Sequence, residues 1–107
     1  MEINQYEILL VNLEPTIGSE IKKTRPCLII SPNEMNHNLR TVTIAPMISQ
    51  SHKYPTRVKV KHNEQVGWVI LDQIRTVDKQ RIIRKLGQLN SAEIAECKRI
   101  IKETFVD

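Results

Sequence analysis

Several residue types that build common functional sites are scarce in this sequence. Only four aromatic residues occur among 107, too few for the base-stacking sheet of an RRM-type RNA-binding domain. The two cysteines, Cys27 and Cys97, lie far apart without a CxxC pair, so we expect reduced thiols in the core. The three histidines have no metal-ligand spacing, and the cysteines do not complete such a set. We therefore expect a protein without a metal or another cofactor.

Long apolar runs and several well-known enzyme motifs are also missing. No apolar stretch approaches the roughly 20 residues that span a bilayer, so we expect no membrane segment. Residues 1–8 (MEINQYEI) lack the basic and apolar regions of a signal peptide, which favours a cytoplasmic protein. The HExxH, Walker, GxGxxG and GxSxG patterns do not occur, so the sequence signatures of the enzymes that depend on them are absent.

What the chain does have is a modest excess of positive charge. Lysine and arginine number 16 against 12 aspartates and glutamates, which gives a formal net charge of +4 and a pI near 9.3. Ordinary solvated surfaces also reach an excess of this size. The charge favours polyanions or acidic protein segments as partners over basic ones.

The hydrophobic pattern predicts one domain, residues 1–107, made largely of short strands. Residues 57–62 (RVKVKH) alternate cleanly, with Val58 and Val60 on one face and basic side chains on the other. A polar loop is predicted between the first two strands, and a turn-rich connection follows the second strand. The other strands are predicted at residues 6–13, 26–30, 41–46 and 67–74, while residues 81–89 fit a strand or a short helical turn.

The end of the chain predicts a helix. Asn90 and Glu93 have the spacing of an N-cap and its capping-box partner. Apolar residues then recur at helical spacing, at Ile94, Cys97, Ile101 and Phe105. Many short strands with one late amphipathic helix predict a mainly β protein, a small and strongly bent β-barrel with helices added.

Two polar residues next to apolar strands have open roles on this pattern alone. Arg25 directly precedes Pro26, which fixes the start of a strand and restricts the arginine to extended conformations. This position fits an ordinary surface charge as well as a guanidinium held for a purpose. Asp72 interrupts an apolar run, and a hydrogen-bonded turn acceptor is as good an interpretation as a functional carboxylate.

Three blocks of the sequence resemble the MazF/PemK/Kid toxins of bacterial toxin–antitoxin systems. They are residues 11–32 (VNLEPTIGSEIKKTRPCLIISP), 43–58 (TIAPMISQSHKYPTRV) and 67–82 (GWVILDQIRTVDKQRI). Their order and spacing match the family nearly end to end. The resemblance implies an SH3-like β-barrel of the PemK/CcdB type, with short helices and a C-terminal α-helix. It also implies a homodimer that cleaves single-stranded RNA at short sequences without a metal, and a cognate antitoxin that silences it through an acidic C-terminal segment.

The resemblance assigns roles to individual residues. Arg25 matches the family's catalytic arginine, and metal-free attack by a ribose 2′-OH would leave 2′,3′-cyclic phosphate and 5′-OH ends. Ile48 stands where the family has a threonine that assists the arginine, and isoleucine has no donor. Ser49 could supply the hydroxyl only if the chain bends there, because successive strand residues face opposite sides. Looser matches to an RNA-binding surface are Ser19, Glu20, Lys22, Lys23, Gln50, His52, Lys53, Asp72, Gln73 and Arg75, of which the last group of three fits a structural role equally well.

Two alternatives remain beside a sequence-specific endoribonuclease. Because Ile48 removes a donor, the chain could be an inactive homologue that binds RNA or an antitoxin without cleavage. The same fold also occurs in gyrase-poisoning toxins related to CcdB, although Arg25 and the three blocks favour the ribonuclease lineage.

Overall fold

A computed structural model describes residues 1–62 and 64–106 of the chain. Seven strands, two α-helices and two short 3₁₀ helices are found in this part of the chain. In chain order they are β1 (Glu7–Asn12), β2 (Thr24–Ile29), α1 (Asn33–Asn36), β3 (Thr41–Ile48), β4 (Arg57–His62), β5 (Gln65–Ile70), η1 (Leu71–Gln73), β6 (Arg75–Asp78), η2 (Lys79–Arg81), β7 (Ile82–Gln88) and α2 (Ser91–Phe105).

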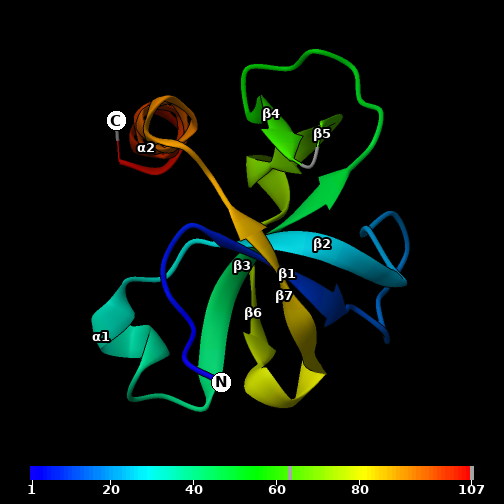
Figure 1. The fold of residues 1–107 in the computed structure, drawn as a ribbon. Helices are drawn as coiled ribbons and strands as arrows, with labels where there is room; N and C mark the ends of the chain where they lie inside the picture. Colours follow the sequence, from blue (N-terminus) through cyan, green and yellow to red (C-terminus); the bar gives the residue numbers. More distant parts are fainter. Residues whose placement is uncertain (63, 107) are drawn as a thin grey trace.

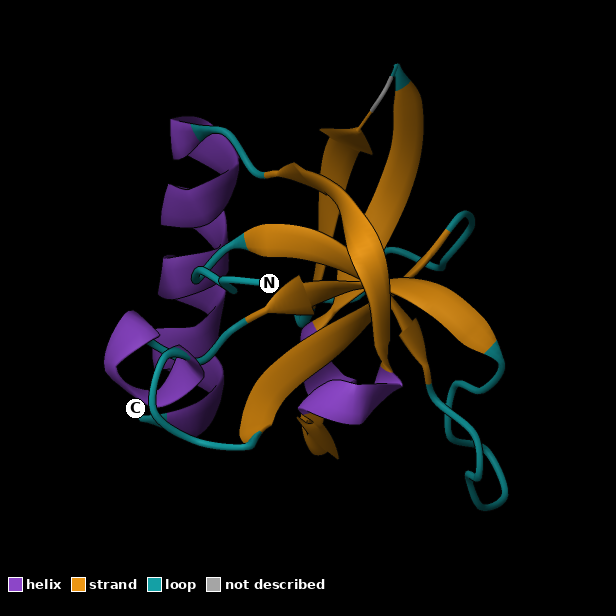
Figure 2. Cartoon of the chain, turned by 60° about the horizontal axis from the view of Figure 1, so that its bottom comes forward, coloured by secondary structure: helices purple, strands orange, loops and turns teal. Residues whose placement is uncertain are grey.

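The strands form one antiparallel sheet in the order β4-β5-β3-β2-β1-β7, and β6 pairs with β3 beside this path. Strand β3 holds the sheet together, since its first half pairs with β6 and its end pairs with β5. The sheet curls on itself, and α2 lies along one side of the curl (Figures 1 and 2). The predicted mainly β class is therefore confirmed, in the form of a half-barrel with β4 and β7 at its two edges.

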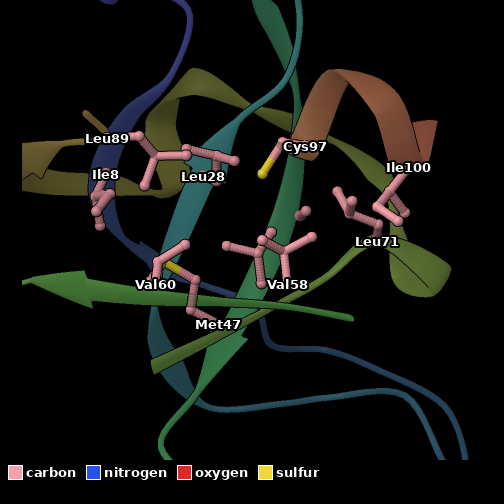
Figure 3. Packing of buried hydrophobic residues seen from close by; sticks show 11 residues of the cluster. Ile8, Leu28, Met47, Val58, Val60, Leu71, Leu89, Cys97 and Ile100 are labelled. Carbon is pink, nitrogen blue, oxygen red and sulfur yellow. The ribbon is translucent and has the colours of Figure 1, made fainter. Parts of the chain in front are cut away.

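Buried apolar side chains gather on both faces of the curled sheet. One cluster fills the inside of the curl, where Leu28 and Met47 meet Val58 and Val60, and α2 adds Cys97 (Figure 3). The second cluster lies on the other face. It consists of Ile3, Leu9, Val11, Leu13, Cys27, Ile29, Val42, Ile44 and Val77. Neighbouring positions of a strand alternate between the two clusters, which is the side-chain period of a β-strand.

The two cysteines are free and buried, which confirms the prediction of core thiols. Burial raises the pKa of the Cys27 thiol to about 12, against the opposing charges of Arg75 and Arg25. Burial also raises the pKa of Cys97 to about 12, and the carboxylates of Glu93 and Glu96 add to this shift. Both thiols therefore stay protonated near neutral pH and act as small apolar side chains.

Helix α2 begins as the sequence predicts. Asn90 Oδ1 accepts the Glu93 N–H at 2.8 Å, and Glu93 Oε1 accepts the Asn90 N–H at 3.0 Å. The second oxygen of Glu93 accepts the Lys61 N–H at 2.8 Å and so joins the helix to the edge strand β4. The predicted apolar stripe is wrong at its end, because Phe105 is 58% exposed in the single chain.

Several element boundaries differ from the prediction. The strand predicted at 67–74 ends at Ile70, because Leu71, Asp72 and Gln73 form a 3₁₀ turn. Strand β6 was not predicted, and the segment at 81–89 is a strand rather than a helical turn. Asp78 separates β6 from β7 by accepting the Gln80 N–H at 2.8 Å.

The connection predicted at 31–38 contains the single helical turn α1. The buried side chain of Asn36 holds this turn by donating to the Ser31 carbonyl at 2.7 Å. Neither helix in the described part of the chain has the length and apolarity that a bilayer span requires.

Candidate active site

Arg25 lies in an extended strand, as its place before Pro26 predicts. It is the second residue of β2 and pairs with Val11 of β1. Its side chain is half-buried, and Nε donates a hydrogen bond to the Lys22 carbonyl at 3.1 Å. The guanidinium is therefore tied to the loop that precedes it instead of extending freely into solvent.

Strands β2 and β3 separate beside Arg25, at two prolines. The β2–β3 ladder runs only to the pair Cys27 and Pro46, and neither Pro26 nor Pro46 has an N–H to donate. The end of β3 pairs instead with β5, with Ile48 opposite Trp68. A cavity of about 180 Å³ opens where the strands part. We call it the Arg25 cavity, and its walls are Arg25, Pro26, Met47, Ile48, Ser49, His62, Gln65, Val66 and Gly67.

The three residues predicted at the catalytic centre line this one cavity. Ile48, which the resemblance matches to the family's threonine, is the last residue of β3 and is half-buried. Ser49 is exposed and follows the end of the strand. The alternation of strand residues no longer applies at Ser49, so its hydroxyl and Ile48 can line the same cavity.

The loop of residues 13–23 carries four of the residues predicted to border RNA. Ser19, Glu20, Lys22 and Lys23 are all exposed, and the loop lies far from α1 in Figure 1. Glu20 Oε1 accepts the Ile17 N–H at 3.0 Å, which keeps this carboxylate within the loop.

Lys23 adopts a left-handed conformation with φ of 73°. Its N–H is accepted by Glu14 Oε1 at 2.9 Å, and its carbonyl accepts the Leu13 N–H at 2.9 Å. The loop is therefore ordered by its own contacts just before Arg25.

Gln73 and Arg75, at the end of η1 and the start of β6, also hold the loop of residues 13–23. Gln73 Oε1 accepts the Ile21 N–H at 2.9 Å, across 52 residues of sequence. Arg75 Nη1 donates to the Leu13 carbonyl at 3.3 Å. Both side chains thus contact the loop that leads to Arg25, which is the structural alternative that the sequence left open.

Asp72 holds the second loop, residues 49–56. Its carboxylate accepts hydrogen bonds from Arg57 Nε at 3.2 Å, Arg57 Nη2 at 3.4 Å and Thr56 Oγ1 at 2.9 Å. Burial opposes ionisation, but the hydrogen bonds from Arg57 and Thr56 outweigh it, so the pKa of Asp72 lies below its ordinary value. Arg57 also donates to Ser51 Oγ at 2.9 Å and lies 4.8 Å above the Tyr54 ring.

Sequence reasoning missed Arg57, because the alternation of β4 indicated only an outward-facing charge. Its role depends on partners in the loop and in η1, which no periodic pattern reports.

The remaining predicted residues occupy two further hollows. Gln50 and His52 line a hollow of about 390 Å³ that shares Ile48 with the Arg25 cavity. Lys53 lines a larger hollow of about 680 Å³ between β4 and α2, beside Trp68. Ile48 thus connects Gln50 and His52 to Arg25, whereas Lys53 faces a different surface. Within residues 1–62 and 64–106, no group of three or more His, Cys, Asp or Glu side chains could hold a metal ion.

The chain is similar to several known proteins. Endoribonuclease EndoA of Bacillus subtilis is 31% identical over 96 residues, which cover 84% of this chain and 83% of EndoA. The crystal structure of MazF from Deinococcus radiodurans superposes with a TM-score of 0.86 at 23% identity, covering 96% of each chain.

An endoribonuclease in complex with its cognate antitoxin from a mycobacterial species has the same fold. It superposes with a TM-score of 0.80 at 20% identity and covers 94% of this chain and 92% of its own. The model of the PemK-like, MazF-like toxin family of type II toxin–antitoxin systems matches residues 4–105. This match spans nearly the whole chain, and the protein belongs to that family.

Proposed function

We propose that this protein is a toxin that cleaves single-stranded RNA, such as mRNA, at specific short sequences without a metal ion. The observation that carries the proposal is the Arg25 cavity, where Ser49 and Arg25, whose Nε is bound to the Lys22 carbonyl, line one small space. The relationship to EndoA, an endoribonuclease by name, supports the same reaction class.

In this reaction the ribose 2′-OH attacks the adjacent phosphorus, and the bond to the 5′-oxygen breaks. The products are a 2′,3′-cyclic phosphate and a 5′-OH end, because the 2′-OH and not water attacks the phosphorus. Negative charge grows on the phosphoryl oxygens in the transition state. The guanidinium of Arg25 is permanently charged and can donate two parallel hydrogen bonds to these oxygens, which stabilises that charge.

Ser49 takes only part of the role that Ile48 cannot fill, so a second donor at position 48 would add to it. A hydroxyl donor near the scissile phosphate adds to the stabilisation by Arg25, and the loss of one such donor costs about 10²–10³-fold in rate. Ser49 lines the cavity beyond the end of β3, which supports this assignment. The apolar side chain of Ile48 then forms the wall between the Arg25 cavity and the hollow of Gln50 and His52.

RNA would approach over the exposed loop of residues 13–23. Lys22 and Lys23 would contact phosphates, so their removal should weaken binding of all sequences alike. We propose that the acidic segment of a cognate antitoxin competes for this basic loop and that two copies of residues 1–107 form a cytoplasmic homodimer. The exposed apolar residues Phe105 and Val106 are available to such an interface.

Incubation of the purified protein with a long RNA in EDTA tests the proposal. We expect discrete fragments whose 5′-OH ends accept phosphate from polynucleotide kinase without prior dephosphorylation. Because Ile48 lacks a donor, the second candidate is a homologue that binds RNA or antitoxin without cleavage. Intact RNA together with retained binding by a folded protein would favour that candidate and contradict the enzyme.

A further inference from the structure

The Arg25 cavity has one titratable wall residue that neither the family resemblance nor the sequence pattern assigned. We propose that His62 is the general acid of the RNA cleavage and that its imidazolium protonates the leaving 5′-oxygen. This inference rests on the proposed function, because it concerns the same cavity and the same reaction. Its first support is that His62 and Arg25 line one space of about 180 Å³.

The imidazole ring of His62 lies between β4 and β7, the two edge strands of the curled sheet. His62 is the last residue of β4 and shares the face of Val58 and Val60, which are buried. The ring reaches across to β7, the other edge strand of the sheet, and lies directly on Gly87. A Cβ at Gly87 would lie 2.3 Å from His62 Cε1 and 2.9 Å from Nδ1, so the ring can occupy this place only over a glycine.

Apart from His62, the described residues that line the cavity include no group that exchanges protons readily near neutral pH. Arg25 carries a guanidinium, a group that stays protonated in proteins and so cannot act as an acid. The hydroxyl of Ser49 can donate a hydrogen bond but remains a weak acid. Histidine is the side chain whose charge changes most readily around neutral pH, and a positioned acid of this kind contributes about 10²–10⁴-fold.

The proposed step is balanced in atoms and electrons. The O2′–P bond forms while the P–O5′ bond breaks, and the electron pair of the broken bond remains on O5′. His62 gives its proton to O5′, the proton of the 2′-OH passes to solvent water, and His62 regains a proton from solvent. The other residues that line the cavity besides Arg25 and His62 are uncharged, and the ring lies against Gly87 of β7.

The leaving group gives a test that separates an acid from a structural residue. We expect His62→Gln to slow cleavage of ordinary RNA by about 10²–10⁴-fold. The same variant should cleave an RNA with bridging 5′-sulfur at the mapped scissile bond within a few-fold of the unmodified protein, because a thiolate leaves without a proton. His37→Gln is the matched control, since His37 contacts Asn4 at 3.0 Å beside α1 and should not affect either substrate.

Gly87→Ala provides a second route to the same answer. The added methyl displaces the ring, so it should lower cleavage of ordinary RNA and spare the sulfur-containing RNA. In a protein that already carries His62→Gln, Gly87→Ala should lower the cleavage of ordinary RNA little further. If His62→Gln does not fold, as judged by circular dichroism, Gly87→Ala with the two substrates decides in the same way.

Three results would overturn the inference. Undiminished cleavage of ordinary RNA by folded His62→Gln would show that the imidazole is not needed. An equal loss on both substrates would assign His62 to packing or binding instead of proton transfer. If the unmodified protein cleaves neither RNA, the proposed function fails as well, and the unmodified protein in each series distinguishes this case from the other two.

Discussion

The two walls of the Arg25 cavity differ in what they offer to a phosphate. The β2 wall presents a guanidinium whose Nε is fixed on the Lys22 carbonyl. The β3 wall presents the apolar side chain of Ile48 and, one residue later, the hydroxyl of Ser49. In the proposed site, the charge comes from the arginine that the family resemblance indicates, and the hydroxyl comes from Ser49, beyond the end of β3. Charge stabilisation and hydroxyl donation can therefore be separated in this protein.

The supports of the two walls also differ, although both come from the segment of residues 72–75. The loop before Arg25 receives a neutral hydrogen bond, from the Ile21 N–H to Gln73, beside the bond from Arg75 to the Leu13 carbonyl. The loop after Ser49 is held by the ion pair of Asp72 with Arg57. A neutral contact depends little on pH and salt, whereas an ion pair depends on both.

The largest change on the β3 wall is expected from Ile48→Thr. Threonine restores a hydroxyl on a side chain with the same branching at Cβ, so β3 should tolerate it. Cleavage should rise by roughly 10²-fold, the effect of one positioned donor. Initial rates on a short RNA that carries the mapped site measure the gain.

Ser49→Ala is the companion variant, and it should lower the rate of the unmodified protein. If Ser49→Ala changes nothing while Ile48→Thr gives the full gain, the donor role of Ser49 is wrong. If neither variant nor the unmodified chain cuts RNA as a folded dimer, the enzyme account itself is wrong.

A smaller effect is expected from Asp72→Asn, which removes the ion pair that holds the loop of residues 49–56. Asparagine keeps the size of the side chain but removes its negative charge, so Arg57 loses a charged partner. Cleavage should fall by roughly 10-fold, because a displaced loop misplaces Ser49. Glu34→Gln on α1 is a control that also removes one exposed carboxylate, in an element that lies far from the loop in Figure 1. An equal loss in both variants would point to net charge instead of loop position.

Gln73→Met should have a milder effect on the opposite wall. Methionine preserves the length of the side chain but leaves the Ile21 N–H without its acceptor, at a cost of about 1 kcal/mol in the free energy of unfolding. The cleavage rate should drop a few-fold, equally at low and high salt. A loss that disappears at high salt would contradict a neutral support.

The pH dependence of stability should show the same contrast, with the smallest effect of all. The pKa of Asp72 is lowered in the folded state, so its ionised form stabilises the fold at pH values above the ordinary carboxyl pKa. This contribution is lost as pH falls through the lowered folded value. Melting temperatures of the unmodified protein and Asp72→Asn should therefore differ near neutral pH and converge in acid, whereas Gln73→Met should keep a constant difference.

Much of the fold could be predicted because local patterns determine it. The alternation around Val58 and Val60 indicated β4, and the spacing of Asn90 and Glu93 indicated the start of α2. The 3₁₀ turn η1 was missed because buried Leu71 continues the apolar run of β5 into a segment where the chain turns. Phe105 has the right periodicity, but periodicity does not report where the packing surface for a helix ends.

The candidate site could be predicted only in part. The Arg25–Pro26 pair has a local signal, since proline restricts the residue before it. Arg57 and His62 acquire their positions from partners on other elements, Asp72 and Gly87, and no spacing along the sequence links them. Sequence patterns therefore predict the position of Arg25, whose conformation an adjacent residue restricts. They do not predict the positions of Arg57 and His62, which depend on contacts between distant parts of the chain.

The most direct test of the central claim compares Arg25→Ala with Arg84→Ala in EDTA. Arg84 is exposed on β7, so both variants remove one positive charge, but only the first empties the cavity of its guanidinium. We predict that the unmodified protein and Arg84→Ala release fragments with 5′-OH ends at similar rates. Arg25→Ala should be slower by at least about 10³-fold, at the upper end for a transition-state contact. Equal rates for the two variants would contradict the claim that the Arg25 cavity is the site of RNA cleavage.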